Sequence, residues 1–128
     1  MHLIKLSFFF ILLFTACSPQ SNLQDDLQGK WHMAAVRIYE QDASPQLNPT
    51  GGRWISFQAD GKFTSGEGDK QENAGTYTFK EADKSLHLDS DAGPGDDSNW
   101  QLIFRPDTLL MRGIGTERQQ RSEVIMVR

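Results

Sequence analysis

The sequence predicts an all-β domain, an eight-stranded antiparallel up-and-down barrel that follows a short helical turn. Short runs of alternating apolar and polar residues recur along the chain, and turn residues separate them. The alternation places the apolar side chains on one face, which is typical of an antiparallel sheet with one wet face. A closed ring of strands linked by hairpins also leaves no exposed edge. A sandwich of two sheets is the alternative topology.

The helical turn is expected just before the first strand. Ser21 or Asn22 can serve as its N-cap, because their side-chain oxygens can accept hydrogen bonds from free backbone N–H groups. Gly29 can end the turn, since glycine adopts the backbone conformation that often follows the last residue of a helix.

Turn residues divide the rest of the chain into eight expected strands. Asp60-Gly61 is the strongest of these signals, because Asp-Gly favours a two-residue hairpin turn. The expected strands are Lys30–Glu40, Arg53–Ala59, Lys62–Gly66, Ala74–Glu81, Ser85–Asp89, Asn99–Arg105, Thr108–Arg112 and Glu117–Val127. The two longer connections, Gln41–Gly52 and Asp89–Ser98, are expected to be loops, and no later helix is expected.

Side-chain parity along these strands predicts which residues face the barrel interior. The predicted inward residues are Ile55, Phe57, Phe63, Tyr77, Phe79, Leu86, Leu88, Trp100, Leu102, Phe104, Leu109, Met111, Val124 and Met126. Small barrels either hold one small ligand or are filled by side chains. The candidates for lining a ligand pocket are Tyr39, Trp54, Phe57, Phe63, Tyr77, Phe79, Trp100, Phe104 and Met111. A cavity of about 300 Å³ or more would favour a ligand, and a filled barrel would favour docking to another protein.

The N-terminus has the organisation of a secretory signal. Met1–Lys5 carries one lysine, Leu6–Phe14 is apolar, and the small residues Thr15 and Ala16 precede Cys17, the one cysteine of the chain. Nine residues rise only about 14 Å as a helix, which is half of the ~30 Å hydrocarbon core of a membrane. The segment is therefore expected to be a cleavable signal and not a membrane span.

The residues before Cys17 resemble the lipobox of bacterial lipoproteins. The resemblance implies that residues 1–16 are removed, that Cys17 carries a diacylglyceryl group on its sulfur and an N-linked acyl chain such as palmitate, and that residues 17–26 comprise this cysteine and a polar tether. Ser18 stands where retention in the inner membrane often uses Asp, which favours the outer membrane. An ordinary signal peptide and an uncleaved anchor are the alternatives.

Four motifs in residues 27–128 resemble those of the lipocalins, and more closely the compact lipocalin-like domains of bacterial lipoproteins. They are Leu27-Gln-Gly29-Lys-Trp31, Trp54-Ile-Ser-Phe57, Asp60-Gly61-Lys-Phe63 and Gly75-Thr76-Tyr77, in this order. The resemblance implies that Trp31 closes the base of the barrel and packs on an arginine from the last strand. Arg118 or Arg121 is the expected partner for this cation–π contact.

Several other functions are disfavoured by the residues. The net charge of -4 argues against a nucleic-acid partner. The acidic stretch Asp89–Asp97 begins like a calcium loop but has Gly93 at its fifth position and Trp100 at its twelfth, so a solvated loop is expected. His32 and His87 lack a nearby ligand partner, so no metal is expected. No nucleophile elbow or dinucleotide motif is present in the sequence, and we expect no cofactor and no enzymatic activity.

The sequence therefore predicts a membrane-anchored lipoprotein of the bacterial cell envelope whose barrel binds a small apolar ligand. The alternative is a packed barrel that acts as a protein–protein interaction module of the envelope, docking through Gln41–Gly52 and Asp89–Ser98. An enzyme is the third hypothesis, because the sequence does not exclude a nucleophile, a histidine and an acid that meet in space.

Overall fold

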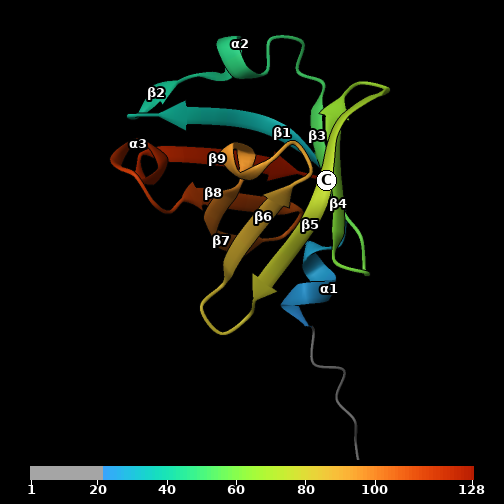
Figure 1. Ribbon diagram of the computed structural model, residues 1–128. Helices are drawn as coiled ribbons and strands as arrows, with labels where there is room; N and C mark the ends of the chain where they lie inside the picture. The colour runs from blue at the N-terminus through green and yellow to red at the C-terminus, as the bar shows by residue number, and fades with distance from the viewer. Residues whose placement is uncertain (1–21) are drawn as a thin grey trace, which may run out of the picture.

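The computed structural model describes residues 22–128 and confirms the predicted fold class. Eight antiparallel strands form a closed ring, because β1 pairs with both β3 and β9 (Figure 1). A ninth, short strand, β2, pairs antiparallel with the last two residues of β1. The strands are β1 (Gly29–Ile38), β2 (Gln41–Asp42), β3 (Arg53–Phe57), β4 (Lys62–Glu67), β5 (Lys70–Lys80), β6 (Ser85–Ser90), β7 (Ser98–Arg105), β8 (Thr108–Gly113) and β9 (Ser122–Val127). The expected signal segment 1–16, Cys17 and the first part of the tether lie outside the described residues.

The predicted helical turn is present as α1 (Leu23–Leu27). Asn22 caps it, since its Oδ1 accepts a hydrogen bond from the backbone N–H of Gln24 at 2.9 Å. Within residues 22–128, no helix has the length and apolar character needed to cross a membrane.

The expectation that no later helix forms is wrong. α2 (Ser44–Leu47) and the 3₁₀ turn η1 (Pro94–Asp96) interrupt the two connections that were expected to be loops. α3 (Glu117–Gln120) occupies the first part of the expected last strand, which starts only at Ser122. A capping box between Thr116 and Gln119 starts α3, because each residue's side chain bonds the other's backbone N–H.

Other strand boundaries also differ from the prediction by one residue or more, and two of these differences have a clear physical reason. β1 ends at Ile38, because Tyr39 and Glu40 have φ values of 51° and 65° and turn the chain back into β2. β5 begins at Lys70 and not at Ala74. Its first residues pair with β4, but they are polar on both faces and so lack the alternation that predicts a strand.

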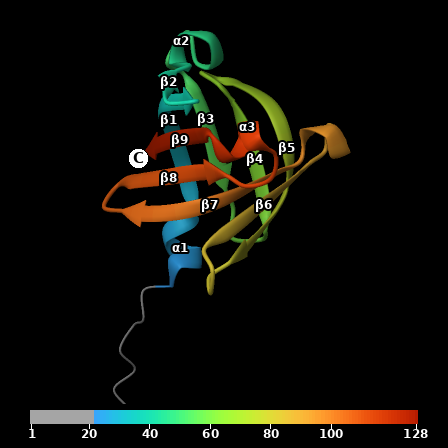
Figure 2. The same cartoon turned by 90° about the vertical axis from the view of Figure 1, so that its left-hand side faces the viewer.

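The two ends of the barrel differ. α1 and α2 lie at opposite ends in both views (Figures 1 and 2). The α1 end is packed: Leu27, Trp31, Phe57 and Tyr77 are all buried, and the rings of Phe57 and Tyr77 meet edge to face with centroids 5.1 Å apart. Aromatic pairs favour this geometry, so side chains close this end.

Trp31 closes the barrel base, but its cationic partner is Arg128. The guanidinium of Arg128 lies 4.1 Å from the centre of the Trp31 ring, and the indole N–H donates to the carbonyl of Leu27 at 2.8 Å. The expected partner, Arg118 or Arg121, is wrong. Both precede β9, whereas the far end of β9 is level with Trp31, since Val127 pairs with the next residue of β1, His32.

Gly75 in β5 is required by close packing at this end. A Cβ atom there would lie 2.8 Å from a ring carbon of Phe63 and 2.1 Å from the carbonyl oxygen of Asp89. Both are far inside normal contact distance, so another residue would displace the Phe63 ring or β6.

Ionisation of Tyr77 should lower the stability of the protein at alkaline pH. Its hydroxyl donates to the carbonyl of Gln58 at 2.5 Å and accepts from the Gln24 amide at 3.1 Å. Burial, which outweighs the Gln24 hydrogen bond, raises the pKa of Tyr77, and the charge of Asp60 adds to this. Because the folded state keeps the phenol neutral, its contribution is complete below the unfolded pKa of about 10 and is lost as pH rises through the folded pKa.

We therefore expect the midpoint of thermal unfolding to fall above about pH 10, and Tyr77→Phe to remove part of this fall. The variant should also lose about 1 kcal/mol of stability at neutral pH with the hydrogen bond to Gln58. Tyr39→Phe, at the other and exposed tyrosine, is the control and should keep the wild-type profile. An unchanged alkaline slope in Tyr77→Phe would contradict this assignment.

Candidate functional site

A cavity of about 190 Å³ lies inside the barrel, beyond the packed α1 end. Strands β1, β3, β4 and β6 to β9 all contribute to its wall, which is mainly apolar. Ile55, Leu88, Trp100 and Val124 belong to this wall. The volume lies below the ~300 Å³ expected in the sequence analysis to favour a ligand, which is the lower end for sites of drug-sized ligands. It exceeds the roughly 150 Å³ in which an engineered protein cavity holds benzene. The cavity therefore suits a molecule of about one ring.

Methionine is concentrated in this wall. The chain has four methionines, and Met33, Met111 and Met126, all except Met1, border the cavity. Met111 and Met126 are 4% and 2% exposed, so their side chains are enclosed by the barrel. Methionine is flexible and polarisable and can adapt to ligands of different shape.

Asn48 bridges the place where β1 and β3 separate. The ladder between these strands ends at His32 and Trp54. Beyond it, the buried Asn48 amide donates to the carbonyl of Met33 at 3.1 Å and accepts from the N–H of Arg53, also at 3.1 Å. The Asn48 side chain thus replaces the backbone hydrogen bonds that the next residues of β1 and β3 would otherwise make. It holds two residues of the cavity wall, Met33 and Arg53, together.

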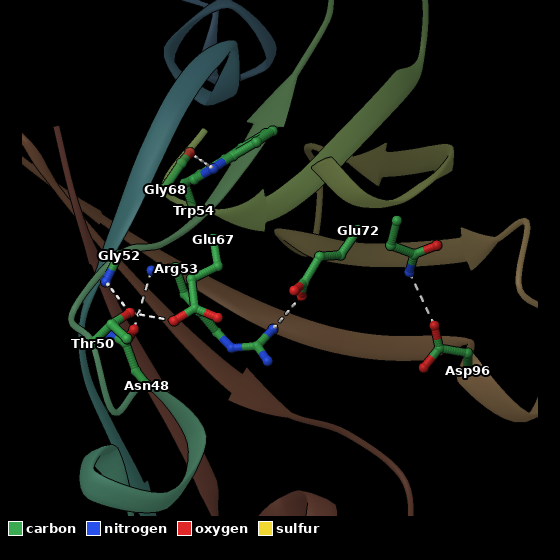
Figure 3. Close-up of polar contacts among 10 residues, drawn as sticks. Asn48, Thr50, Gly52, Arg53, Trp54, Glu67, Gly68, Glu72 and Asp96 are labelled. Carbon is green, nitrogen blue, oxygen red and sulfur yellow. Dashed lines mark hydrogen bonds and ion pairs between the residues drawn. The ribbon is translucent and has the colours of Figure 1, made fainter. Parts of the chain in front are cut away.

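Arg53 of β3 borders the cavity, and two acidic residues, Glu67 of β4 and Glu72 of β5, lie beside it (Figure 3). Arg53 belongs to the inward row of β3 and lies 3.7 Å from the carboxylate of Glu72. Glu67 faces Arg53 in the strand register, but its carboxylate accepts a hydrogen bond from the hydroxyl of Thr50. Ser65 is the other polar residue of the wall among those that the structure describes.

The acidic loop between β6 and β7 folds back on the barrel. Asp96 accepts hydrogen bonds from the Asn73 amide at 3.0 Å and the Ser90 hydroxyl at 2.9 Å, and Asp97 accepts from the backbone N–H of Ser90 at 3.0 Å. Ser90 is 5% exposed, so this network is partly buried. The carboxylates therefore act as hydrogen-bond acceptors that attach the loop to β5 and β6.

Three of the nine predicted ligand residues, Trp54, Trp100 and Met111, border the cavity. The indole of Trp54 nevertheless lies on the outer face, where Lys30 sits 4.4 Å from its ring and its N–H donates to Gly68 at 2.9 Å. The other six lie elsewhere. Phe57, Phe63 and Tyr77 belong to the packed core, Phe79 and Phe104 pack on each other at 5.8 Å, and Tyr39 is 49% exposed at a turn.

Four wall residues that were not ligand candidates, Ile55, Leu88, Val124 and Met126, belong to the predicted inward set. Sequence reasoning missed three others, Met33, Arg53 and Ser65. Each lies two residues from an inward aromatic or aliphatic side chain, namely Trp31, Ile55 and Phe63, on the same strand. The period-two rule therefore contained the signal. Arg53 and Ser65 are not identified because a charged or small residue at or near the end of a run does not look like part of a barrel interior, and Met33 lies on a strand for which no inward row is predicted.

The fold, but not the sequence, resembles a solved structure. The crystal structure of a DUF4847 family protein from Bacteroides vulgatus aligns with 83% of this chain and 96% of its own, with a TM-score of 0.59 and 13% sequence identity. At this identity the likeness shows the fold alone. Neither protein-family models nor curated proteins gave a match to the sequence.

Removing the Asn48 bridge should destabilise the barrel. Asn48→Ala leaves the Met33 carbonyl and the Arg53 N–H without their partner, which costs about 1–3 kcal/mol when such groups are buried. Asn99→Ala is a matched control, since Asn99 is exposed and bonds the half-buried His87 at the surface, and it should change stability by less than about 0.5 kcal/mol. Urea unfolding measures both; equal values for the two variants would contradict the role of Asn48.

Proposed function

We propose that the barrel binds a small, mainly apolar molecule in the cavity at its α2 end. The observation that carries this proposal is a cavity of about 190 Å³ whose wall is built from inward residues of seven strands, three methionines among them. Removing an apolar ring from water is favourable by roughly 25 cal/mol per Å² of buried surface. The small volume limits the occupant to about the size of benzene or toluene, with room for one polar group at the mouth.

An interaction module is the second candidate, and one surface favours it. Tyr39 and Leu47 are 49% and 42% exposed, and Tyr39 and Arg118 border an open concavity near β2. Tyr39 and Glu40 also hold positive φ angles, which cost non-glycine residues free energy and often mark functional turns. Tyrosine and arginine are frequent at the centres of protein interfaces.

Ligand binding can be followed directly through the methionine methyl groups. Toluene should shift the NMR signals of Met33, Met111 and Met126 in a saturable way, because these methyl groups border the cavity. Ser65→Leu should fill part of the space and weaken toluene binding by about tenfold or more, as overlap in a packed interior costs about 1–3 kcal/mol. Thr64→Leu, one residue away on the outer face of β4, is the control.

Two outcomes would contradict the ligand proposal. If toluene shifts none of the three methyl signals, the cavity does not admit it, and the interaction module becomes the better proposal. Equal weakening by Ser65→Leu and Thr64→Leu would place the binding outside the barrel.

We also propose that lipid on Cys17 anchors the protein to the bacterial cell envelope, in the outer membrane. The apolar segment Leu6–Phe14 and the small residues before Cys17 support it. The full chain should then fractionate with membranes and carry the mass of its acyl chains, since two chains suffice for stable anchoring. Cys17→Ser should release it, whereas Ser21→Ala, in the expected tether, should remain bound. A Cys17→Ser protein that still fractionates with membranes refutes the lipid anchor.

A further inference from the structure

Arg53 is the one charged side chain in the cavity wall among the residues that the structure describes. It stands at the start of β3, two residues before Ile55 in the same inward row, so it marks the mouth of an apolar cavity. Its side chain is 43% exposed, which places the guanidinium between the cavity and solvent. A guanidinium carries five N–H donors in a fixed plane and binds planar oxyanions with two parallel hydrogen bonds.

The present partner of Arg53 holds it weakly. The nearest carboxylate oxygen, from Glu72, is 3.7 Å away, longer than a charge-assisted hydrogen bond, and the Glu72 side chain is itself 36% exposed. Exposed pairs of this kind contribute little to stability. Glu72 is the extra residue of a β-bulge, because Ser65 pairs with Asn73 while Gly66 pairs with Gln71. Bulges often redirect a side chain beside a functional site, and here the bulge brings Glu72 within reach of Arg53 (Figure 3).

The other acidic groups near the mouth are engaged elsewhere. Glu67 accepts from the Thr50 hydroxyl, and Asp96 accepts from Asn73 and Ser90. Within the described residues, Glu72 is therefore the only ion-pair partner of Arg53. Most of its donors remain free for a ligand, and a ligand oxyanion held against the apolar wall would be less screened by water than Glu72 is.

We infer that the ligand of this barrel carries a carboxylate or a similar planar oxyanion that binds Arg53 in place of Glu72, while its apolar part fills the cavity. The inference rests on the proposed function and adds the chemical class of the ligand. The cavity volume of about 190 Å³ fits one ring, and the head group would lie at the mouth beside Arg53. Benzoate has this size and charge.

Benzoate and benzamide form a matched pair of probes, since they share shape and size and differ in charge. With the full chain at neutral pH, both should shift the methyl signals of Met33, Met111 and Met126, and benzoate should bind about tenfold more tightly or better. Arg53→Gln should abolish this preference while toluene still binds, which shows that the cavity is intact. Glu72→Gln should strengthen benzoate binding by up to about fivefold and leave benzamide unchanged. Arg105→Gln, at an exposed arginine outside the cavity wall, is the control.

The possible failures can be told apart. If toluene and benzamide bind but benzoate binds no more tightly, the head-group inference is overturned and the apolar cavity stands. A benzoate preference that survives in Arg53→Gln overturns the role of Arg53 in the same way. If none of the probes shifts the methionine signals, the ligand proposal and this inference fall together.

Discussion

The double pairing of β1 is the constraint on which the barrel depends. One edge of β1 pairs with β9 over His32–Ile38, which closes the ring, and the other edge pairs with β3 only over Gly29–His32. The strand does not follow both neighbours along its whole length: its second half pairs with β9 but parts from β3. The segment around α2 occupies that gap: Asn48 bonds β1 and β3, and Ser44 accepts from the N–H of Val36 at 3.0 Å. The pairing of β1 with β9, the parting of β1 from β3 and the segment around α2 are thus linked, and the cavity lies beside this gap.

The parts of the fold that the sequence predicts are those set by neighbours along the chain. Alternation identifies the inward rows, because side chains of a strand point to opposite faces in turn. The Asp60-Gly61 signal correctly marks the hairpin between β3 and β4, but the loop has three residues, 59–61, between the hydrogen-bonded Gln58 and Lys62. Of Asp60 and Gly61, only Gly61 has a positive φ, 83°, as in a type I turn followed by a left-handed residue. Trp31 is buried at the α1 end, next to the short helix that precedes β1. These features need no knowledge of distant contacts.

The parts that sequence reasoning misses depend on contacts between distant residues. Arg128 lies over Trp31 only because β9 runs antiparallel to β1 and ends level with it. Glu72 reaches Arg53 only because a bulge in β5 shifts its register. The capping box that starts α3 is a local signal, with Thr116 three residues before Gln119, and could have been recognised. The polar residues on both faces at the start of β5 give no alternation, so the first residues of that strand are missed although its later part is predicted.

The cavity lowers the free energy of unfolding that a fully packed barrel would have. Empty space in a protein core costs roughly 24 cal/mol per Å³, so about 190 Å³ corresponds to an upper limit of about 4–5 kcal/mol. Water that enters beside the half-exposed Arg53 lowers this cost, but the wall deeper in the barrel is apolar and offers water few partners. Domains of this size have total stabilities of about 5–15 kcal/mol, so the loss is substantial. A longer side chain at Ser65 would reduce it, and the packed α1 end shows that this chain fills space closely where Leu27, Phe57 and Tyr77 meet. A bound apolar ligand would explain this contrast between the two ends, because it would make the dispersion contacts with the cavity wall that side chains make with one another at the α1 end.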